Sequence, residues 1–277
     1  MAISLKHDWC ILKSDRRLEG NVCLLMGGGS SFAAGGPSNG QAVALTFARH
    51  GAHVVVVDMN LASAEATRNQ IVGEGGSAIA LQADVSRHED VRAAVAQVLQ
   101  RHQRIDILYN NVGIEAAGGV IDTSEEAWDH VHDVTLKSVF LACKEVVPTM
   151  IEQRKGVILN VSSTASLRWG PTEYIAYHSS KAGLNHMSRI MARQYARHGI
   201  RCNVIVPGMM DTPHIRSFYA DKSPEELRMI LAERDRRCPM GRQGTCWDVA
   251  NAALFLASDE AAYINGILLP VDGALTV

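Results

Sequence analysis

The chain has 277 residues, of which 47% are hydrophobic, and a net charge of −2, a composition typical of an α/β protein. A chain of this length buries enough surface to fold without disulfides, and its six cysteines form no CxxC pair. We therefore expect free cysteines in a reducing compartment, the cytoplasm. There is no long basic run and no stretch of ~20 apolar residues, so we expect neither nucleic acid nor a membrane as a partner.

Short apolar segments alternate with longer helical patterns from Asn21 onward. We expect strands at 22–26, 53–58, 78–83, 105–110, 157–161, 201–206 and 267–271. Helices are expected between them at 41–50, 62–73, 89–102, 125–153, 177–198 and 247–258. Most of the strands are near-continuous apolar runs, as in parallel sheets that helices cover on both faces. The pattern predicts an α/β fold, a single-domain Rossmann-type doubly wound parallel sheet with helices on both faces, over residues 18–277.

Two segments lie outside this regular pattern. In residues 1–17 charges interrupt every apolar stretch, and we interpret this segment as an N-terminal tail or arm. Residues 209–245 contain Pro213, Pro224 and Pro239 around a charged helical piece, and they are long for a connection within one domain. We expect this second segment to form a substrate lid.

Glycines crowd the connection between the first expected strand and the first expected helix, residues 26–40. Glycines at this point let the backbone approach a pyrophosphate, which then binds to the N–H groups at the start of the helix. The candidate cofactor-binding residues here are Gly27, Gly29, Ser38, Asn39 and Gly40. A flexible surface turn that binds nothing is the alternative interpretation.

Asp58 closes the apolar strand 53–58, where the ribose-binding acid of a dinucleotide site belongs. A carboxylate there accepts hydrogen bonds from the adenosine ribose and repels a 2′-phosphate, and no arginine is adjacent in the sequence. The cofactor expected is therefore NAD rather than NADP. A role for Asp58 as a helix N-cap or turn residue is the alternative.

Tyr177 and Lys181 stand four residues apart, so in a helix both lie on one face. A nearby ammonium favours the phenolate form, which would lower the pKa of the tyrosine toward the working range of an acid–base catalyst. Ser163 follows the expected strand 157–161, at the end of the sheet where open parallel sheets place their sites. The three residues together predict an acid–base site next to a nucleotide.

The sequence resembles the classical short-chain dehydrogenase/reductase family over nearly all of residues 18–277. The resemblance is carried by ordered segments at matching intervals, namely Asn110-Asn111-Val112-Gly113, Asn160-Val161-Ser162-Ser163, Tyr177-xxx-Lys181, Pro207-Gly208-Met209-Met210-Asp211-Thr212 and Gly266-Ile267-Leu268-Leu269-Pro270-Val271-Asp272-Gly273. It implies that Tyr177 exchanges a proton with the substrate oxygen and that Ser163 hydrogen-bonds that oxygen. Lys181 would hold the nicotinamide ribose and keep Tyr177 acidic.

The resemblance also implies further cofactor contacts along the edge of the sheet. Asp84 and Val85 would border the adenine, while Asn111 and Gly113 would line the cofactor. Thr212 would hold the carboxamide of the nicotinamide. Two more residues of the same motif, Pro207 and Gly208, would also contact the cofactor. A homotetramer built through the two long helices on either side of Ser163 is implied as well.

Three departures from the family pattern stand out. About seven residues are inserted between Ser30 and Gly40, and we hypothesise that 32–37 form a flap beside the phosphates. Thr135 occupies the place of the family's fourth catalytic residue, an asparagine, and only its backbone carbonyl can serve the proton relay. Ser163 lies one residue farther from Tyr177 than usual, but the motif favours it over Thr164; Tyr174 is a rival phenol with no lysine four residues later.

The expected reaction is NAD(H)-dependent interconversion of a secondary alcohol and a ketone by hydride transfer. Substrate selection is expected in 163–174 and 209–237, whose mixed apolar and charged pattern suits a cyclic, aromatic or medium-chain substrate. Two alternatives remain open, an NADPH-dependent 3-oxoacyl thioester reductase and a non-catalytic NAD-binding scaffold or sensor. His130 and His132 are too poorly placed on a helix to bind a metal together, so we expect no metal site.

Overall fold

The computed structural model describes residues 16–30, 36–170 and 172–277. In this part of the chain, seven parallel strands form one sheet in the order β3-β2-β1-β4-β5-β6-β9. The strands are β1 (Val22–Met26), β2 (His53–Asp58), β3 (Ser77–Gln82), β4 (Ile107–Asn110), β5 (Gly156–Val161), β6 (Ile200–Pro207) and β9 (Leu268–Val271). The order reverses between β1 and β4, so the predicted doubly wound parallel sheet is confirmed, with its switch point at the carboxyl ends of these two strands.

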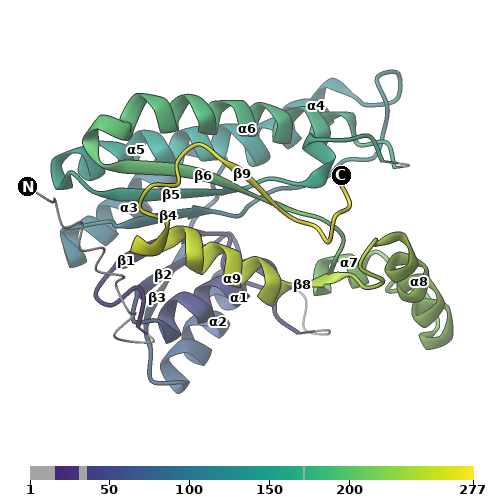
Figure 1. Ribbon diagram of the computed structural model, residues 1–277, viewed down its shortest axis with the longest axis horizontal. Coiled ribbons are helices and arrows are strands. Elements are labelled where there is room, and N and C mark those ends of the chain that lie inside the picture. Colours follow the sequence, from purple (N-terminus) through teal and green to yellow (C-terminus); the bar gives the residue numbers. More distant parts are fainter. Residues whose placement is uncertain (1–15, 31–35, 171) are drawn as a thin grey trace, which may run out of the picture.

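Helices cover both faces of the sheet (Figure 1). One layer contains α1 (Asn39–Arg49), α2 (Leu61–Gly73) and α9 (Cys246–Ala257). The opposite layer contains α3 (His88–His102), α4 (Glu125–His132), α5 (Ser138–Gln153) and α6 (Ile175–Tyr195). The side chains of Ser38, Asn60 and Ser124 accept hydrogen bonds from the first turns of α1, α2 and α4, which fixes where these helices begin.

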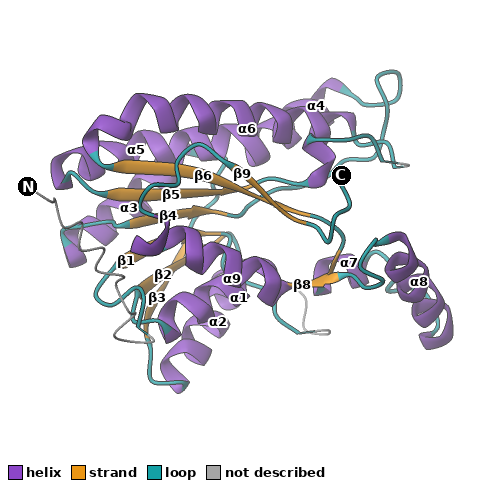
Figure 2. Cartoon of the chain, in the orientation of Figure 1, coloured by secondary structure: helices purple, strands orange, loops and turns teal. Residues whose placement is uncertain are grey.

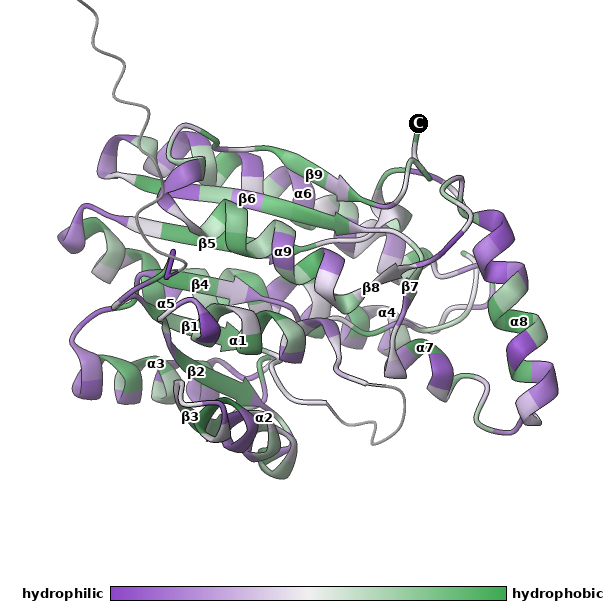
Figure 3. Ribbon diagram, turned by 60° about the horizontal axis from the view of Figure 1, so that its bottom comes forward, coloured by the Kyte–Doolittle hydropathy of each residue, from purple (hydrophilic) through white to green (hydrophobic). Residues whose placement is uncertain are grey.

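The apolar runs of the strands form two hydrophobic clusters, one on each face of the sheet. All five residues of β1 are buried, with alternate side chains entering opposite clusters, such as Cys23 in one and Leu24 in the other. Figure 3 shows hydrophobic colour along the strands. This double burial is why the strands have continuous apolar sequences rather than an alternating pattern.

The expected single helix over 125–153 contains a wider turn than an ordinary helix. One turn of π-helix, η1 (Asp133–Lys137), separates α4 from α5, and the backbone N–H of Ser138 donates to the carbonyl of Asp133. The Ser138 hydroxyl donates to the carbonyl of Val134 at 2.6 Å, which satisfies an acceptor that the wider turn leaves over. Single π-turns of this kind often occur at functional sites, and this one contains Thr135.

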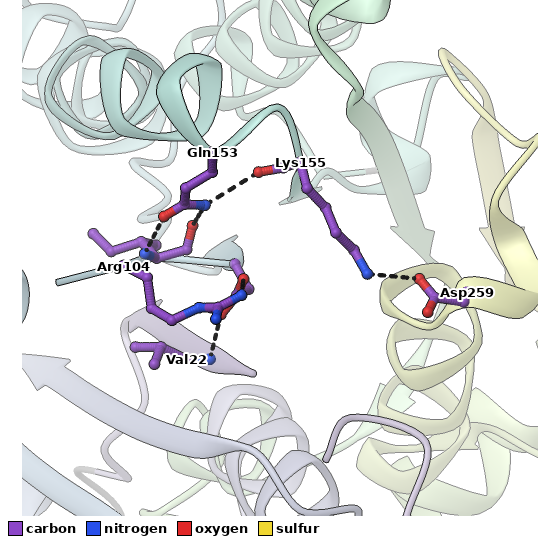
Figure 4. A network of polar contacts seen from close by, with 7 residues as sticks. Val22, Arg104, Gln153, Lys155 and Asp259 are labelled. Atoms are coloured by element: carbon purple, nitrogen blue, oxygen red, sulfur yellow. Dashed lines mark hydrogen bonds and ion pairs between the residues drawn. The ribbon is translucent and has the colours of Figure 1, made fainter. Parts of the chain in front are cut away.

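A polar network ties the amino ends of the strands together, opposite the switch point (Figure 4). The carboxylate of Asp106 is buried, accepts from the backbone N–H of Val22 at 2.8 Å, and pairs with both arms of the Arg104 guanidinium. Gln153 bonds to the backbone of Ile105 through both ends of its amide. These contacts fix the register of β1 and β4 and therefore the alignment of their carboxyl ends.

Residues 209–245, called the lid segment below, form an excursion beyond the carboxyl end of the sheet (Figure 2). The segment contains β7 (Met210–Asp211), α7 (Pro213–Ser217), α8 (Pro224–Arg237) and β8 (Gly244–Thr245). The pairing of β7 with β8 closes its base, and α8 begins with a capping box formed by Ser223 and Glu226. No residue of α8 is buried, and its surface is mostly hydrophilic in Figure 3.

In the described residues, five cysteines are free and buried, namely Cys23, Cys143, Cys202, Cys238 and Cys246. The helices of this same part of the chain are too short or too polar to span a membrane. Residues 1–15, and with them most of the expected N-terminal arm, lie outside the described residues, as do 32–35 of the hypothesised flap.

Candidate active site

A cleft of about 470 Å³ opens at the carboxyl ends of β4, β5 and β6 and extends under the lid segment. Ten of the residues singled out in the sequence line it, namely Ser38, Asn39, Asn111, Gly113, Ser163, Tyr177, Lys181, Pro207, Gly208 and Thr212. Its volume falls within the range of small-molecule sites. The other expected site residues, Gly27, Gly29, Gly40, Asp58, Asp84, Val85 and Thr135, lie outside its wall.

The glycines between β1 and α1 bring two stretches of backbone into close contact. Gly27 has a φ of 83°, which side chains rarely adopt, and a Cβ on Gly40 would lie 2.1 Å from the carbonyl oxygen of Gly27. The amide of Asn111 donates to that same carbonyl at 2.9 Å and so fixes it against β4. Next to this turn, Asn39 Oδ1 is buried and accepts no hydrogen bond within the described chain.

A hydrogen bond joins the two described stretches of chain on either side of the insertion. The hydroxyl of Ser38 donates to the carbonyl of Gly29 at 3.0 Å and accepts from the N–H of Gln41 at the start of α1. One side chain therefore closes the base of the insertion and caps the helix. Asn39, the first residue of α1, lines the cleft, and its side-chain oxygen is buried and has no hydrogen-bond partner within the described chain. These features fit the ribose and pyrophosphate of a dinucleotide.

Asp58 ends β2 next to the glycine turn rather than capping a helix. One carboxylate oxygen accepts from the N–H of Gly29 at 3.0 Å and the other from the N–H of Asn60 at 3.0 Å. The N-cap of α2 is Asn60, whose side chain accepts from the N–H of Ser63. The alternative of Asp58 as an N-cap is therefore wrong, although its bond to Asn60 is that of a turn residue.

The next strand end carries Asp84 and Val85. Asp84 accepts from both the N–H and the hydroxyl of Ser86, which shapes the turn after β3. Val85 is buried and lines a small cavity with Met26 and Val112 rather than the main cleft.

Gly113 lies against the catalytic candidates. A Cβ at Gly113 would lie 3.0 Å from Lys181 Nζ, so the lysine packs directly over this glycine. Pro207 ends β6 and Gly208 follows it, and Thr212 is buried at the start of α7. A Cβ at Gly208 would lie 2.7 Å from the Cα of Asp272, so this glycine lets the chain after β6 pass the C-terminal segment.

Tyr177 and Lys181 lie on the same face of α6 and both line the cleft. The distance from Lys181 Nζ to the centre of the Tyr177 ring is 5.6 Å. The lysine also donates to the carbonyl of Val161 at 2.7 Å, which holds its ammonium at the end of β5. Ser163 hydrogen-bonds the Tyr177 phenol, and its hydroxyl accepts from the N–H of Ala165 at 3.2 Å.

The pKa of Tyr177 departs from the sequence expectation. Burial, and then the negative charge of Glu115, raise the pKa of the phenol above its ordinary value, and only the bond to Ser163 lowers it. Burial lowers the pKa of Lys181 to about 8, against a small opposing effect of Glu115. The expectation of an acidified phenol is wrong for the protein alone, because burial is the largest effect on the pKa of each group and disfavours its charged form. At neutral pH the Tyr177 phenol therefore keeps its proton.

Thr135 lies one layer behind the cleft, in the π-turn. Its buried hydroxyl accepts from the N–H of Ile114 at 3.2 Å, so it binds the segment that follows β4. That segment continues to Glu115, whose carboxylate lies 3.2 Å from His214 on α7. Thr135 thus helps to position the loop that joins the floor of the cleft to the lid segment.

The sequence interpretation did not single out four charged residues of the cleft, although three of them lie within the segments expected to select the substrate. Glu115 stands two residues after Gly113, and its place just beyond the end of β4 was the available signal. The other three are arginines, one after β5 and two on α8, namely Arg168, Arg234 and Arg237. No sequence motif identifies these three arginines, because they come together at the cleft only through the fold of the lid segment. Within the described residues no group of three His, Cys, Asp or Glu side chains could hold a metal.

Known proteins resemble this chain over almost its whole length. The family model described as enoyl-(acyl carrier protein) reductase matches residues 33–276. The 3-oxoacyl-(acyl-carrier-protein) reductase FabG of Thermotoga maritima is 36% identical over 94% of this chain and 100% of its own length. The 2,5-dichloro-2,5-cyclohexadiene-1,4-diol dehydrogenase LinX of Sphingobium indicum is 34% identical over 94% of this chain and 98% of its own.

A third relative is the 2-(R)-hydroxypropyl-CoM dehydrogenase of Xanthobacter autotrophicus, which is 37% identical over 86% of this chain and 94% of its own length. Among solved structures, one from Burkholderia xenovorans, titled as a short-chain dehydrogenase/reductase, superimposes with a TM-score of 0.88 at 39% identity. It covers 94% of this chain and 98% of that one.

Proposed function

The chain belongs to the classical short-chain dehydrogenase/reductase family and is an oxidoreductase of that family, and from this premise we propose that it interconverts a secondary alcohol and a ketone with NAD(H). One observation carries the proposal: Tyr177, Lys181 and Ser163 line a single cleft that also reaches Ser38 and Asn39 at the start of α1. The cleft also contains apolar groups, such as Ile215 and Tyr219. A cyclic, aromatic or medium-chain substrate suits this mixture.

The bound nicotinamide would supply the hydride donor or acceptor. In the direction of ketone reduction, the Tyr177 hydroxyl donates its proton to the oxygen that becomes the alcohol. Its raised pKa keeps that proton in place at neutral pH. Ser163 donates a hydrogen bond to the same oxygen and so orients the carbonyl. Lys181, held by Val161, places its positive charge next to the phenol and stabilises the phenolate that the proton transfer leaves.

In the direction of alcohol oxidation, the Tyr177 phenolate accepts the proton of the alcohol. Because the phenolate forms only at high pH, the oxidation rate should rise as the medium becomes alkaline. Thr135 would act through position alone, by holding Ile114 and with it the loop that bears Glu115. A general acid of this type contributes roughly 10²–10⁴-fold to the rate.

Asp58 supports NAD over NADP as the cofactor. One of its oxygens accepts from the N–H of Gly29 in the glycine turn and the other from the N–H of Asn60 after β2, so the carboxylate has a fixed position at the end of β2. A carboxylate fixed there would accept hydrogen bonds from the ribose hydroxyls, and its negative charge would repel a 2′-phosphate. Reduction of a 3-oxoacyl thioester is the second candidate, favoured by the 36% identity to the Thermotoga reductase.

The test is NADH against NADPH oxidation by the purified full chain, with cyclohexanone, acetophenone and acetoacetyl-CoA as oxidants. We expect NADH-linked reduction of the simple ketones. Tyr177→Phe should abolish turnover and leave the dissociation constant of NADH within about twofold, since the ring remains and only the proton is lost. Turnover retained by Tyr177→Phe would overturn the assignment, and acetoacetyl-CoA as the sole substrate would favour the second candidate.

We further propose a cytoplasmic homotetramer. The buried, free cysteines of the described residues suit a reducing compartment. The helices α4, α5 and α6 expose large hydrophobic side chains, namely Trp128, Phe140 and Ile190, which suit burial between subunits. Sedimentation equilibrium should give four times the chain mass, and a monomer would refute the assembly.

A further inference from the structure

Three arginines line the active-site cleft from two separate parts of the fold. Arg168 lies in the connection that follows β5, whereas Arg234 and Arg237 lie in the last turns of α8. In Figure 1, α8 stands beyond the carboxyl end of the sheet, so the lid segment brings its arginines to the cleft from outside the main layers. Each guanidinium has five N–H donors arranged for planar, two-point binding of an oxyanion.

None of these three guanidinium groups forms an ion pair with a carboxylate of the described chain. Arg168 donates to the carbonyl of Leu275 at 2.7 Å, and Arg234 donates to the side-chain oxygen of Gln243 at 2.6 Å. The neutral oxygens position both side chains and leave the other donors for a ligand. Arg237 is exposed and makes no hydrogen bond or ion pair within the described residues.

Three of the other four arginines of the lid segment form ion pairs, and the fourth, Arg228, does not line the cleft. Arg216 pairs with Asp211 at 2.7 Å, Arg236 with Glu233 at 2.6 Å and Arg242 with Asp248 at 3.4 Å. These pairs show that acidic partners are available in the segment, yet Arg234 and Arg237 have none. Within the described chain, no acid neutralises the positive charges of Arg234 and Arg237, and both residues line the cleft.

The cleft has one carboxylate in its wall, Glu115, among the residues that the structure describes. It lies 3.2 Å from the imidazole of His214, so it is already engaged on the lid side. Three guanidinium groups and the Lys181 ammonium thus face one acid, although the whole chain carries a net charge of −2. Such a local excess of positive charge attracts and orients anions.

The dinucleotide phosphates do not account for this charge. Their expected cradle is the glycine turn before α1, where backbone N–H groups and a helix N-terminus would bind phosphate without arginines. The segments that carry the arginines, after β5 and on α8, are instead those in which the sequence pattern places substrate selection, and both line the same cleft as Tyr177. The charge therefore belongs to the substrate half of the cleft.

We propose that the substrate is a ketone, or the corresponding secondary alcohol, that carries an anionic group such as a carboxylate, sulfonate or phosphate. The inference rests on the proposed function and adds its substrate class. The carbonyl lies at Tyr177, an apolar middle contacts Trp169, Ile215 and Tyr219, and Arg237 binds the anion together with Arg168 and Arg234. Guanidinium–oxyanion pairs of this kind fix the far end of the substrate and so orient the carbonyl.

The experiment uses matched ketones that differ only in charge. Levulinate, acetylbenzoate and cyclohexanone carboxylate are each compared with their carboxamide in NADH-linked reduction by the full chain. We expect at least one carboxylate to exceed its amide in kcat/KM by about 10- to 100-fold, as for hydrogen bonds to a charged group. Arg237→Gln should reduce that ratio to within about threefold of unity, mainly through KM.

Arg236→Gln is the matched control, because Arg236 is the preceding residue and is paired with Glu233. It should keep the carboxylate-to-amide ratio, and NADH should bind all variants with the same dissociation constant. A ratio near unity in the unaltered chain, or an equal ratio in Arg237→Gln and the parent, would overturn the proposal. A weaker NADH complex in Arg237→Gln would also overturn it, by assigning the arginine to the cofactor.

Calorimetry separates this inference from the proposed function. Acetylbenzoate and its amide are titrated into the NADH-loaded chain of the Tyr177→Phe variant, in which no turnover is needed. Tighter binding of the carboxylate, lost in the double variant with Arg237→Gln, supports the anion site even if reduction is never observed. Equal binding of the two compounds counts against the anion site whatever the activity of the parent chain.

Discussion

The charge at the end of β2 should decide which dinucleotide the protein uses. Asp58→Asn removes the negative charge but keeps one side-chain oxygen as an acceptor for a backbone N–H of the nucleotide turn. The turn should therefore keep its shape. We expect binding of NADPH to improve relative to NADH.

The size of the change follows from Coulomb's law. Two unit charges 4 Å apart interact by about 1 kcal/mol in water and about 4 kcal/mol near a protein surface of lower effective dielectric. Asp58 is partly buried, so a value of about 2 kcal/mol is reasonable for its repulsion of a 2′-phosphate. That corresponds to roughly a 30-fold rise in the NADPH-to-NADH ratio of association constants. Loss of the charged acceptor should also lower the free energy of unfolding by about 1 kcal/mol.

The assay is a fluorescence titration of both reduced cofactors against the parent and the variant. Glu65→Gln, which removes an exposed carboxylate of α2, is the control for overall charge and should leave the ratio unchanged. If Asp58→Asn shifts the ratio no more than Glu65→Gln does, the assignment of Asp58 as the selecting charge is refuted.

Three further perturbations test other parts of the account. Gly40→Ala should weaken NADH binding at least about tenfold, because the new Cβ would lie 2.1 Å from the Gly27 carbonyl oxygen. Overpacking of this kind costs about 1–3 kcal/mol. The control in the same titration is Gly73→Ala, because there is open space around Gly73. Glu115→Gln removes a charge that raises the pKa of Tyr177, so the alkaline limb of the alcohol-oxidation rate should move to lower pH; an unchanged pH–rate profile would count against this role. Asp106→Asn should lower the free energy of unfolding by about 2 kcal/mol in urea denaturation, and an unchanged midpoint would show that the buried network is not stabilising.

The sequence predicted most of the fold because nearly all of its signals are local. Strand β1 was expected with the bounds that the structure has, since its continuous apolar run has the length of a fully buried strand. The helix over 125–153 was expected as one piece because a π-turn does not interrupt the apolar periodicity of its flanks. The structure of the lid segment could not be predicted from the sequence, because it depends on the pairing of Met210 with Gly244, which are far apart in the chain.

The sequence predicted those residues of the candidate site that come directly after strands and match the order of motifs in a known family. Tyr177 and Lys181 share a helix face by spacing alone, and the structure places them so. Their pKa shifts could not be read from spacing, because burial outweighs the attraction of the two groups. Arg168 and Arg237 line one cleft only because of the tertiary fold, and no local sequence pattern predicts that they do so.

The transfer of label from deuterated NADH to a ketone would reveal whether hydride transfer and protonation by Tyr177 occur together. If Tyr177 protonates a carbonyl oxygen beside the nicotinamide, reduction of cyclohexanone by the parent chain should place deuterium on the carbinol carbon, and Tyr177→Phe should form no labelled alcohol. An alcohol whose carbinol hydrogen comes from solvent, or labelled alcohol formed equally by both chains, would contradict the account.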